Sequence, residues 1–146
     1  MIQLYMTPRY RASINAKKWL EKQGLEFKEI NPLKQSPELR GQLIHIISLL
    51  EGDIYDIIST RSKRYSNLGK MIEDLSFTQL IDYLISEPRL IRQPLIFDDV
   101  KLQIGFNSTE IRAFIPRHIR KVELNFVKSR IEKEENGFNT TGFRLD

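Results

Sequence analysis

The side chains that most often act as nucleophiles or metal ligands are scarce in this chain. Its 146 residues include no cysteine and only two histidines, His45 and His118. Without cysteine there is no disulfide bond, no thiolate nucleophile and no zinc–cysteine site. Two histidines so far apart in sequence do not form a metal-ligand motif. We therefore expect no metal, no cofactor and no catalytic residue, and turn to side chains that bind.

Basic residues are the main candidates for binding. The chain has a formal net charge of +4 and an isoelectric point near 9.4. The excess is concentrated in residues 57–71, which include no acidic residue, and in residues 117–130. Such a stretch can meet a DNA backbone or an acidic protein, and it can equally be a solvated surface. Both interpretations stay open.

The elements that would position these side chains follow from the hydrophobic period. Alternating apolar residues predict strands near residues 2–5, 25–30, 94–97 and 100–104. A helix separates the first two strands, which implies a parallel pair with a crossover helix. The order is βαβ, a helical block, then ββα. This order predicts an α/β, thioredoxin-like fold: a four-stranded mixed sheet with a helical insertion.

The same pattern predicts how one folded domain is organised. Residues 1–35 and 88–130 would form the core, and residues 36–87 the inserted helical lobe. Residues 131–146 would form a flexible tail, because they show no period. No apolar run approaches the ~20 residues that cross a bilayer, and the N-terminus lacks the pattern of a signal peptide. We expect a cytoplasmic protein with no membrane partner.

The loop after the first strand is where such a core would bind an anion. It leads into the N-terminus of the first helix, where backbone N–H groups and the helix dipole stabilise negative charge. The loop carries Arg9 and Arg11, and Arg92 comes shortly before the third strand. These arginines are our candidates for contact with an oxyanion.

Several segments, in matching order and spacing, resemble the Spx family of transcription regulators from low-GC Gram-positive bacteria. These proteins share their fold with ArsC-type arsenate reductases. The segments are Leu4–Pro8 with Ala16–Leu20, Asp56–Lys63, Leu90–Ile96, Leu102–Asn107 and Glu110–Arg117. The resemblance covers about residues 1–130. It implies an ArsC-like fold, and in thioredoxin-like folds a cis bond is expected before the proline of the third strand, here Gln93–Pro94.

The chain departs from the family at its redox switch. The resemblance places the family's Cys-x-x-Cys pair on Tyr10 and Ser13. It also implies an arginine before the proline of the third strand, where this chain has Gln93 beside a retained Arg92. A phenol with a pKa of about 10 does not replace a thiolate. We therefore expect a variant without thiol redox sensing.

The resemblance implies a binding function rather than an enzymatic one. Spx proteins bind the C-terminal domain of the RNA polymerase α subunit and change which promoters the polymerase uses. Their contact surface lies around the glycine that ends the second helix, which is Gly52 here. We expect this surface to include Tyr10 and Ser13 on the side of the first loop. A nearby family position that is commonly basic falls on Ile47.

Two of these residues also have purely structural explanations. A glycine at the end of a helix can be required for a positive φ, which would account for Gly52. Tyr10 can fill the space left by a smaller thiol, or it can be a loop residue that faces solvent. Alternatively it anchors an interface, because tyrosine buries apolar area and keeps a polar group. Each pair of explanations stays open.

Other partners follow from the same resemblance. Promoter DNA would be met only through the polymerase complex, with Arg61, Lys63 and Arg64 near the phosphates. The chain shows no helix-turn-helix signature for direct DNA binding. Spx proteins are cleared by the ClpXP protease through their C-termini, but the end of this chain differs from the usual tail, so ClpXP is an open partner.

Two alternative functions are considered. The first is a catalytically dead, arsenate-reductase-like module that still binds an oxyanion through Arg9, Arg11, Arg61 or Arg92. The second is an adaptor for a different protein, since a fold does not determine a function.

Overall fold

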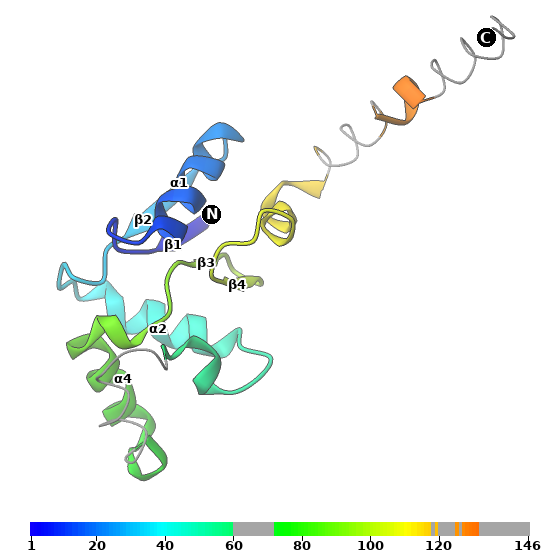
Figure 1. The fold of residues 1–146 in the computed structure, drawn as a ribbon. Helices are drawn as coiled ribbons and strands as arrows, with labels where there is room; N and C mark the ends of the chain where they lie inside the picture. Colours follow the sequence, from blue (N-terminus) through cyan, green and yellow to red (C-terminus); the bar gives the residue numbers. More distant parts are fainter. Residues whose placement is uncertain (60–71, 118, 120–124, 126, 132–146) are drawn as a thin grey trace, which may run out of the picture. The chain divides into compact units, whose positions relative to one another are not determined.

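The computed structural model describes residues 1–59, 72–117, 119, 125 and 127–131 (Figure 1). The chain divides into two units, Met1–Ile111 and Arg112–Asp146. The sheet, the inserted helices and the candidate site described below all belong to the first unit.

Four strands form one mixed sheet. They are β1 (Ile2–Tyr5), β2 (Phe27–Ile30), β3 (Leu95–Phe97) and β4 (Leu102–Ile104). The order is β2-β1-β3-β4, with β1 parallel to β2 and antiparallel pairing from β1 to β3 and from β3 to β4. The Gln93–Pro94 peptide bond is cis. The predicted fold class and the predicted cis bond are both confirmed.

Helix α1 (Arg11–Lys22) makes the crossover between the parallel strands β1 and β2. Its buried residues, Ser13, Ala16 and Leu20, recur at helical spacing and form one face. Gly24 follows the helix with φ at 67°, in the left-handed region that glycine adopts without strain. The glycine therefore ends the helix where the sequence predicts.

The lobe between β2 and β3 is helical where it is described. Its elements are α2 (Glu38–Ser48), the 3-10 helices η1 (Ile54–Ile57) and η2 (Ile72–Asp74), α4 (Phe77–Ser86) and the 3-10 helix η3 (Pro88–Leu90). Helix α4 begins with a capping box. The Ser76 hydroxyl accepts from the N–H of Gln79 at 3.2 Å, and the Gln79 side-chain oxygen accepts from the N–H of Ser76 at 2.9 Å.

A hydrophobic cluster packs the lobe against one face of the sheet. Its buried members include Tyr5, Ile30, Leu95 and Phe97 from the sheet, and Leu43, Ile46, Ile57, Ile81 and Leu84 from the lobe. Leu4 and Ile96 alternate with the strand members and are also buried, but they lie outside this cluster, as does Leu20 of α1. Strands β1 and β3 are therefore buried on both faces, which holds their ends in place.

The end of α2 differs from the prediction. The helix ends at Ser48, and the N–H of Leu49 bonds to the carbonyls of His45 and Ile46. Among the described glycines, positive φ occurs at Gly24 and Gly105 and not at Gly52. The explanation of Gly52 as a positive-φ helix terminus is therefore wrong, because backbone bonds end the helix before the glycine is reached.

After β4 the chain turns at Asn107, whose side-chain oxygen accepts from the N–H groups of Thr109 and Glu110. The 3-10 helix η4 (Glu110–Phe114) follows. Residues 117, 119, 125 and 127–131 are helical. Most of the tail predicted to be flexible, residues 132–146, lies outside the described residues.

The helices in the described part of the chain are too short or too polar to cross a membrane.

Candidate functional site

The loop between β1 and α1 is anchored at its start and exposed at its end. Met6 and Thr7 are buried, and the N–H of Met6 donates to the carbonyl of Ile30 at 2.9 Å. Tyr10 is the N-cap of α1, is 39% exposed and makes no capping bond with its side chain. The first turn of α1 carries no acidic residue. Its side chains therefore supply no negative charge to offset the positive end of the helix dipole.

Gln93 ties this loop to the segment before β3. Its side-chain oxygen accepts hydrogen bonds from the N–H of Thr7, at 2.6 Å, and from the Thr7 hydroxyl. The resemblance implies an arginine at this position. Arginine carries donors and no acceptor, so it could not receive these bonds. The glutamine therefore turns a cationic position into an acceptor that holds the loop.

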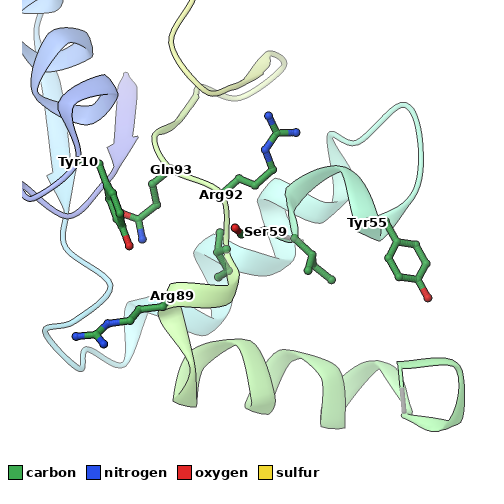
Figure 2. Close-up of a pocket in the computed structure, with 8 residues that line it drawn as sticks. Tyr10, Tyr55, Ser59, Arg89, Arg92 and Gln93 are labelled. Carbon is green, nitrogen blue, oxygen red and sulfur yellow. The ribbon is translucent and has the colours of Figure 1, made fainter. Parts of the chain in front are cut away.

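A pocket of about 570 Å³ lies between the loop and the lobe. It is lined by Tyr10, Tyr55, Ile58, Ser59, Arg89, Ile91, Arg92 and Gln93. Figure 2 shows Tyr10 beside Gln93 at one end of the pocket and Tyr55 at the other. The lining combines two guanidinium groups with two phenols, which suits an anion or a polar protein surface better than an apolar ligand.

The segment before β3 is also bonded to η1. The N–H of Arg92 donates to the carbonyl of Ile57 at 2.7 Å, and the N–H of Ser59 donates to the carbonyl of Leu90 at 2.6 Å. The Arg92 guanidinium donates to the carbonyl of Asp56 at 3.2 Å. The same short segment therefore reaches the first loop through Gln93 and η1 through Arg92.

Two charged or phenolic groups near the loop have shifted pKa values. Burial raises the pKa of the Tyr5 phenol, so this side chain stays neutral at the end of β1. The hydrogen bond and charge of Glu29, 3.0 Å from the Lys17 ammonium, raise the pKa of Lys17. Both shifts move the group away from neutral pH, so neither is suited to exchange protons there.

The structure brings together some of the predicted site residues. Tyr10 and Arg92 line the same pocket. Arg9 and Arg11 are exposed, and neither is among the residues that line this pocket. The three cations predicted to lie near DNA, Arg61, Lys63 and Arg64, lie outside the described residues. Among the predicted oxyanion ligands that the structure describes, Arg92 is therefore the one that lines the pocket.

Ser13 lies beneath the surface. Its exposed fraction is 0%, and its hydroxyl has no hydrogen-bond partner among the described residues. The expected direct contact of Ser13 with a partner is therefore not open to this side chain. The expectation followed the spacing of the family motif, whereas the helical period places Ser13 on the buried face with Ala16 and Leu20.

Gly52 is exposed and lies in the bend before η1. A Cβ atom built on Gly52 would overlap the carboxylate of Asp56. Any other residue must therefore displace that side chain, which belongs to η1. Gly52 allows a close approach of the chain to itself, and its exposed backbone is open to a partner.

Sequence reasoning missed Arg89, Tyr55 and the acceptor role of Gln93. Arg89 lies in η3, and Pro88 signals that α4 stops there. No local signal shows that this turn comes back toward the first loop. Tyr55 follows Asp53, the N-cap of η1, whose carboxylate accepts from the N–H of Tyr55 at 2.9 Å. That Asx-type start of a turn was the one available signal.

Comparison with known proteins decides the family. The sequence profile of the ArsC family matches residues 5–114. The chain belongs to the ArsC family. Within it, the chain is 44% identical over 130 residues to a protein of Streptococcus pneumoniae named global transcriptional regulator Spx, covering 89% of this chain and 97% of that protein. The regulator of the same name from Streptococcus mutans is 40% identical over 134 residues, covering 92% of this chain and 97% of that protein.

Solved structures support the fold of this ArsC-family chain. An arsenate reductase from Vibrio cholerae superposes with a TM-score of 0.61 at 22% identity, covering 71% of this chain and 88% of that one. An arsenate reductase related protein from Brucella melitensis gives a TM-score of 0.54 at 15% identity, covering 77% and 92%. At these identities the likeness concerns the fold alone. The recognised family, with a chain that contains no cysteine, matches the predicted cysteine-free variant.

Proposed function

We propose that this chain regulates transcription by binding the C-terminal domain of the RNA polymerase α subunit, without control by thiol oxidation. The observation that carries the proposal is the 44% identity to a global transcriptional regulator along 97% of that protein's length. An adaptor that kept only the fold would not need to keep this degree of sequence identity along the whole chain.

The proposed contact surface has two parts, Tyr10 at the start of α1 and Gly52 before η1. Both residues are exposed. Tyr55, which belongs to the η1 turn that follows Gly52, lines the same pocket as Tyr10, and this shared lining supports a surface that spans both parts. Tyrosine is enriched among residues that dominate interface energies, because its ring buries apolar area while its hydroxyl finds a polar partner.

A substitution at Gly52 tests this surface. Gly52→Arg should weaken binding to the α-subunit domain by at least about tenfold, because a long side chain would stand where a partner backbone approaches. The folded chain should tolerate the change. The atom that a new Cβ meets is the far end of the Asp56 side chain, and the φ of Gly52 is not positive. We expect the melting temperature to fall by no more than about 5 °C.

Gly41→Arg is the matched control. Gly41 is an exposed glycine within α2, and a Cβ there meets nothing within 4 Å. Titration calorimetry with the purified α-subunit domain should give the Gly41→Arg chain wild-type affinity. Wild-type binding by Gly52→Arg would show that the surface is misplaced. No binding by the wild-type chain would reject the proposed function and leave the fold.

Contact with promoter phosphates is the further part of this proposal. Arg61, Lys63 and Arg64 would act once the chain is bound to the polymerase, and they lie outside the described residues. Their contribution would be electrostatic and would weaken as salt is raised.

A second candidate function is binding of an oxyanion in the pocket. The observation in its favour is the presence of Arg89 and Arg92 in one lining, near the N-terminus of α1. Turnover of such an anion is not part of this proposal, because the chain has no thiol nucleophile. Calorimetry with phosphate, sulfate and arsenate tests this second function. If none of the three anions binds, the second function is rejected.

A further inference from the structure

The two parts of the proposed surface belong to segments far apart in sequence, and one side chain links them. We propose that Gln93 is the positioning residue of this surface. It holds the first loop, which ends in Tyr10, against the segment before β3. That segment is in turn bonded to η1, the turn that follows Gly52. The inference deepens the proposed function and rests on it for its consequence in binding, but the link itself can be tested in the free chain.

The first loop has few other bonds that would fix its exposed end. The N–H of Tyr10 reaches the carbonyl of Thr7 at 3.5 Å, a long hydrogen bond, and the side chain of Tyr10 makes no capping bond. By contrast, the N–H of Thr7 lies 2.6 Å from the side-chain oxygen of Gln93, and the Thr7 hydroxyl donates to the same atom. The Ile14 N–H donates to the Tyr10 carbonyl at 3.1 Å and ties the end of the loop to α1, whereas Thr7 is where the segment before β3 holds the loop.

The backbone next to Gln93 is held by η1. Arg92 bonds to the carbonyls of Ile57 and Asp56 through its N–H and its guanidinium. Ile58 and Ile91 form an isolated antiparallel bridge at the same place. The Asp56 carboxylate in turn packs against Gly52. Hydrogen bonds and one packing contact thus run without a gap from the Tyr10 loop, through Gln93 and Arg92, to the Gly52 bend.

The chemistry of Gln93 makes it hard to replace. Thr7 is only 3% exposed, so water cannot readily take over its N–H and hydroxyl. Two buried donors that lose their acceptor carry a desolvation penalty that the loop can relieve only by moving. An apolar side chain of similar size, which has no acceptor, should therefore release the loop, whereas a carboxylate at the same position should keep it.

Hydrogen exchange of single backbone amides in the free chain tests the link. In Gln93→Leu, the amide of Thr7 should exchange at least about tenfold faster than in wild type. The variant lacks the acceptor of this amide, so opening the loop no longer costs the free energy of that hydrogen bond. The amides of Arg92 and Ser59, which join this segment to η1, should also exchange faster. Gln93→Glu keeps the acceptor and should stay within about twofold of wild type.

Gln42→Leu is the matched control. Gln42 is a half-buried glutamine in α2 whose side chain donates to Gln3 at 3.4 Å, away from the loop. It should leave exchange at Thr7, Arg92 and Ser59 unchanged. In titrations with the α-subunit domain, Gln93→Leu should bind at least about threefold more weakly than wild type, since the loop must then be ordered on binding. Gln93→Glu and Gln42→Leu should bind as wild type does.

The outcomes separate this inference from the proposed function. Unchanged exchange at Thr7 in Gln93→Leu would overturn the link. Faster exchange at Thr7 alone, with Arg92 and Ser59 unchanged, would show that Gln93 holds the loop but does not join it to η1, which also overturns the inference. Faster exchange with unchanged binding would deny the positioning role. If the wild-type chain does not bind the α-subunit domain, the proposed function fails, and exchange at the two segments still decides the link.

Discussion

Tyr10 has an exposed ring, and hydrogen bonds from the neighbouring Thr7 to Gln93 hold its loop. A ring that only filled the space of a smaller thiol would be buried, but Tyr10 is 39% exposed and borders an open pocket. The exposure therefore argues against the space-filling explanation, and it fits both an interface anchor and a loop residue that faces solvent. A tyrosine presented by a fixed loop loses little side-chain freedom when a partner covers it, which is why such residues contribute strongly to interfaces.

The buried hydroxyl of Ser13 leads to a prediction about stability. Its hydroxyl is fully buried without a described partner, and it lies in the first turn of α1. Ser13→Ala removes an unsatisfied polar group and improves helix propensity, so the free energy of unfolding should stay the same or rise by up to about 1 kcal/mol. Urea denaturation measures this change. A loss of more than about 1 kcal/mol would mean that the hydroxyl has a hydrogen-bond partner.

Some residues of the candidate site can be predicted from the sequence and others cannot. Tyr10 and Arg92 were predicted because a family motif marks their positions, and the structure places both at the pocket. The place of Arg89 in the pocket lining and the bonds of Gln93 to Thr7 were missed, because they depend on contacts between residues far apart in the chain. The bond from Thr7 to Gln93 spans 86 positions. No local period or cap encodes such a contact.

At the scale of elements, those with local signals were predictable. The four strands lie close to the predicted ranges, and α1 ends and α4 begins at residue types that favour helix ends, Gly24 and the capping box of Ser76 and Gln79. The end of α2 was not predictable from Gly52, because bonds from Leu49 to earlier carbonyls close the helix first. Helix ends set by backbone bonds alone leave no residue signature, whereas caps made by side chains do.

The capping box of α4 provides a prediction at this scale. Ser76→Ala removes the acceptor for the N–H of Gln79 and should lower the free energy of unfolding by about 1 kcal/mol. Ser76→Asp keeps an acceptor at the N-cap and should restore most of that loss. Thermal or urea denaturation of wild type, Ser76→Ala and Ser76→Asp measures the change in the free energy of unfolding. Equal stability of Ser76→Ala and wild type would show that α4 does not depend on this cap.

At the scale of the whole molecule, the ArsC-family fold holds its first loop without any thiol. The resemblance puts a pair of cysteines at positions 10 and 13, where this chain has an exposed phenol and a buried hydroxyl. What fixes the loop instead is the pair of hydrogen bonds to Gln93, which oxidants do not alter. A disulfide changes with the redox potential, whereas an amide–threonine bond persists under oxidising and reducing conditions alike. We therefore expect the loop to keep one conformation under both conditions, and binding to be constitutive.

We therefore predict that thiol oxidants do not change the affinity of this chain for the α-subunit domain. Treatment with diamide, or with hydrogen peroxide at low dose, should leave the affinity for the α-subunit domain within about twofold, since no cysteine can form a sulfenic acid or a disulfide. The oxidisable sulfurs of the chain are Met1, Met6 and Met71, and Met6 is only 1% exposed, so the dose must stay below that which oxidises methionine.

Two controls make the redox test decisive. The α-subunit domain is also treated with oxidant and assayed separately. An effect of oxidation on that domain is then not mistaken for an effect on this chain. Tyr10→Cys combined with Ser13→Cys restores the Cys-x-x-Cys spacing that the resemblance implies, and its affinity should change on oxidation if the assay can detect a thiol switch. Wild type should not respond in the same experiment. A large change in wild-type affinity under mild thiol oxidant would show that a group other than cysteine controls this surface, and that the hydrogen bonds from Thr7 to Gln93 do not keep the loop in one state.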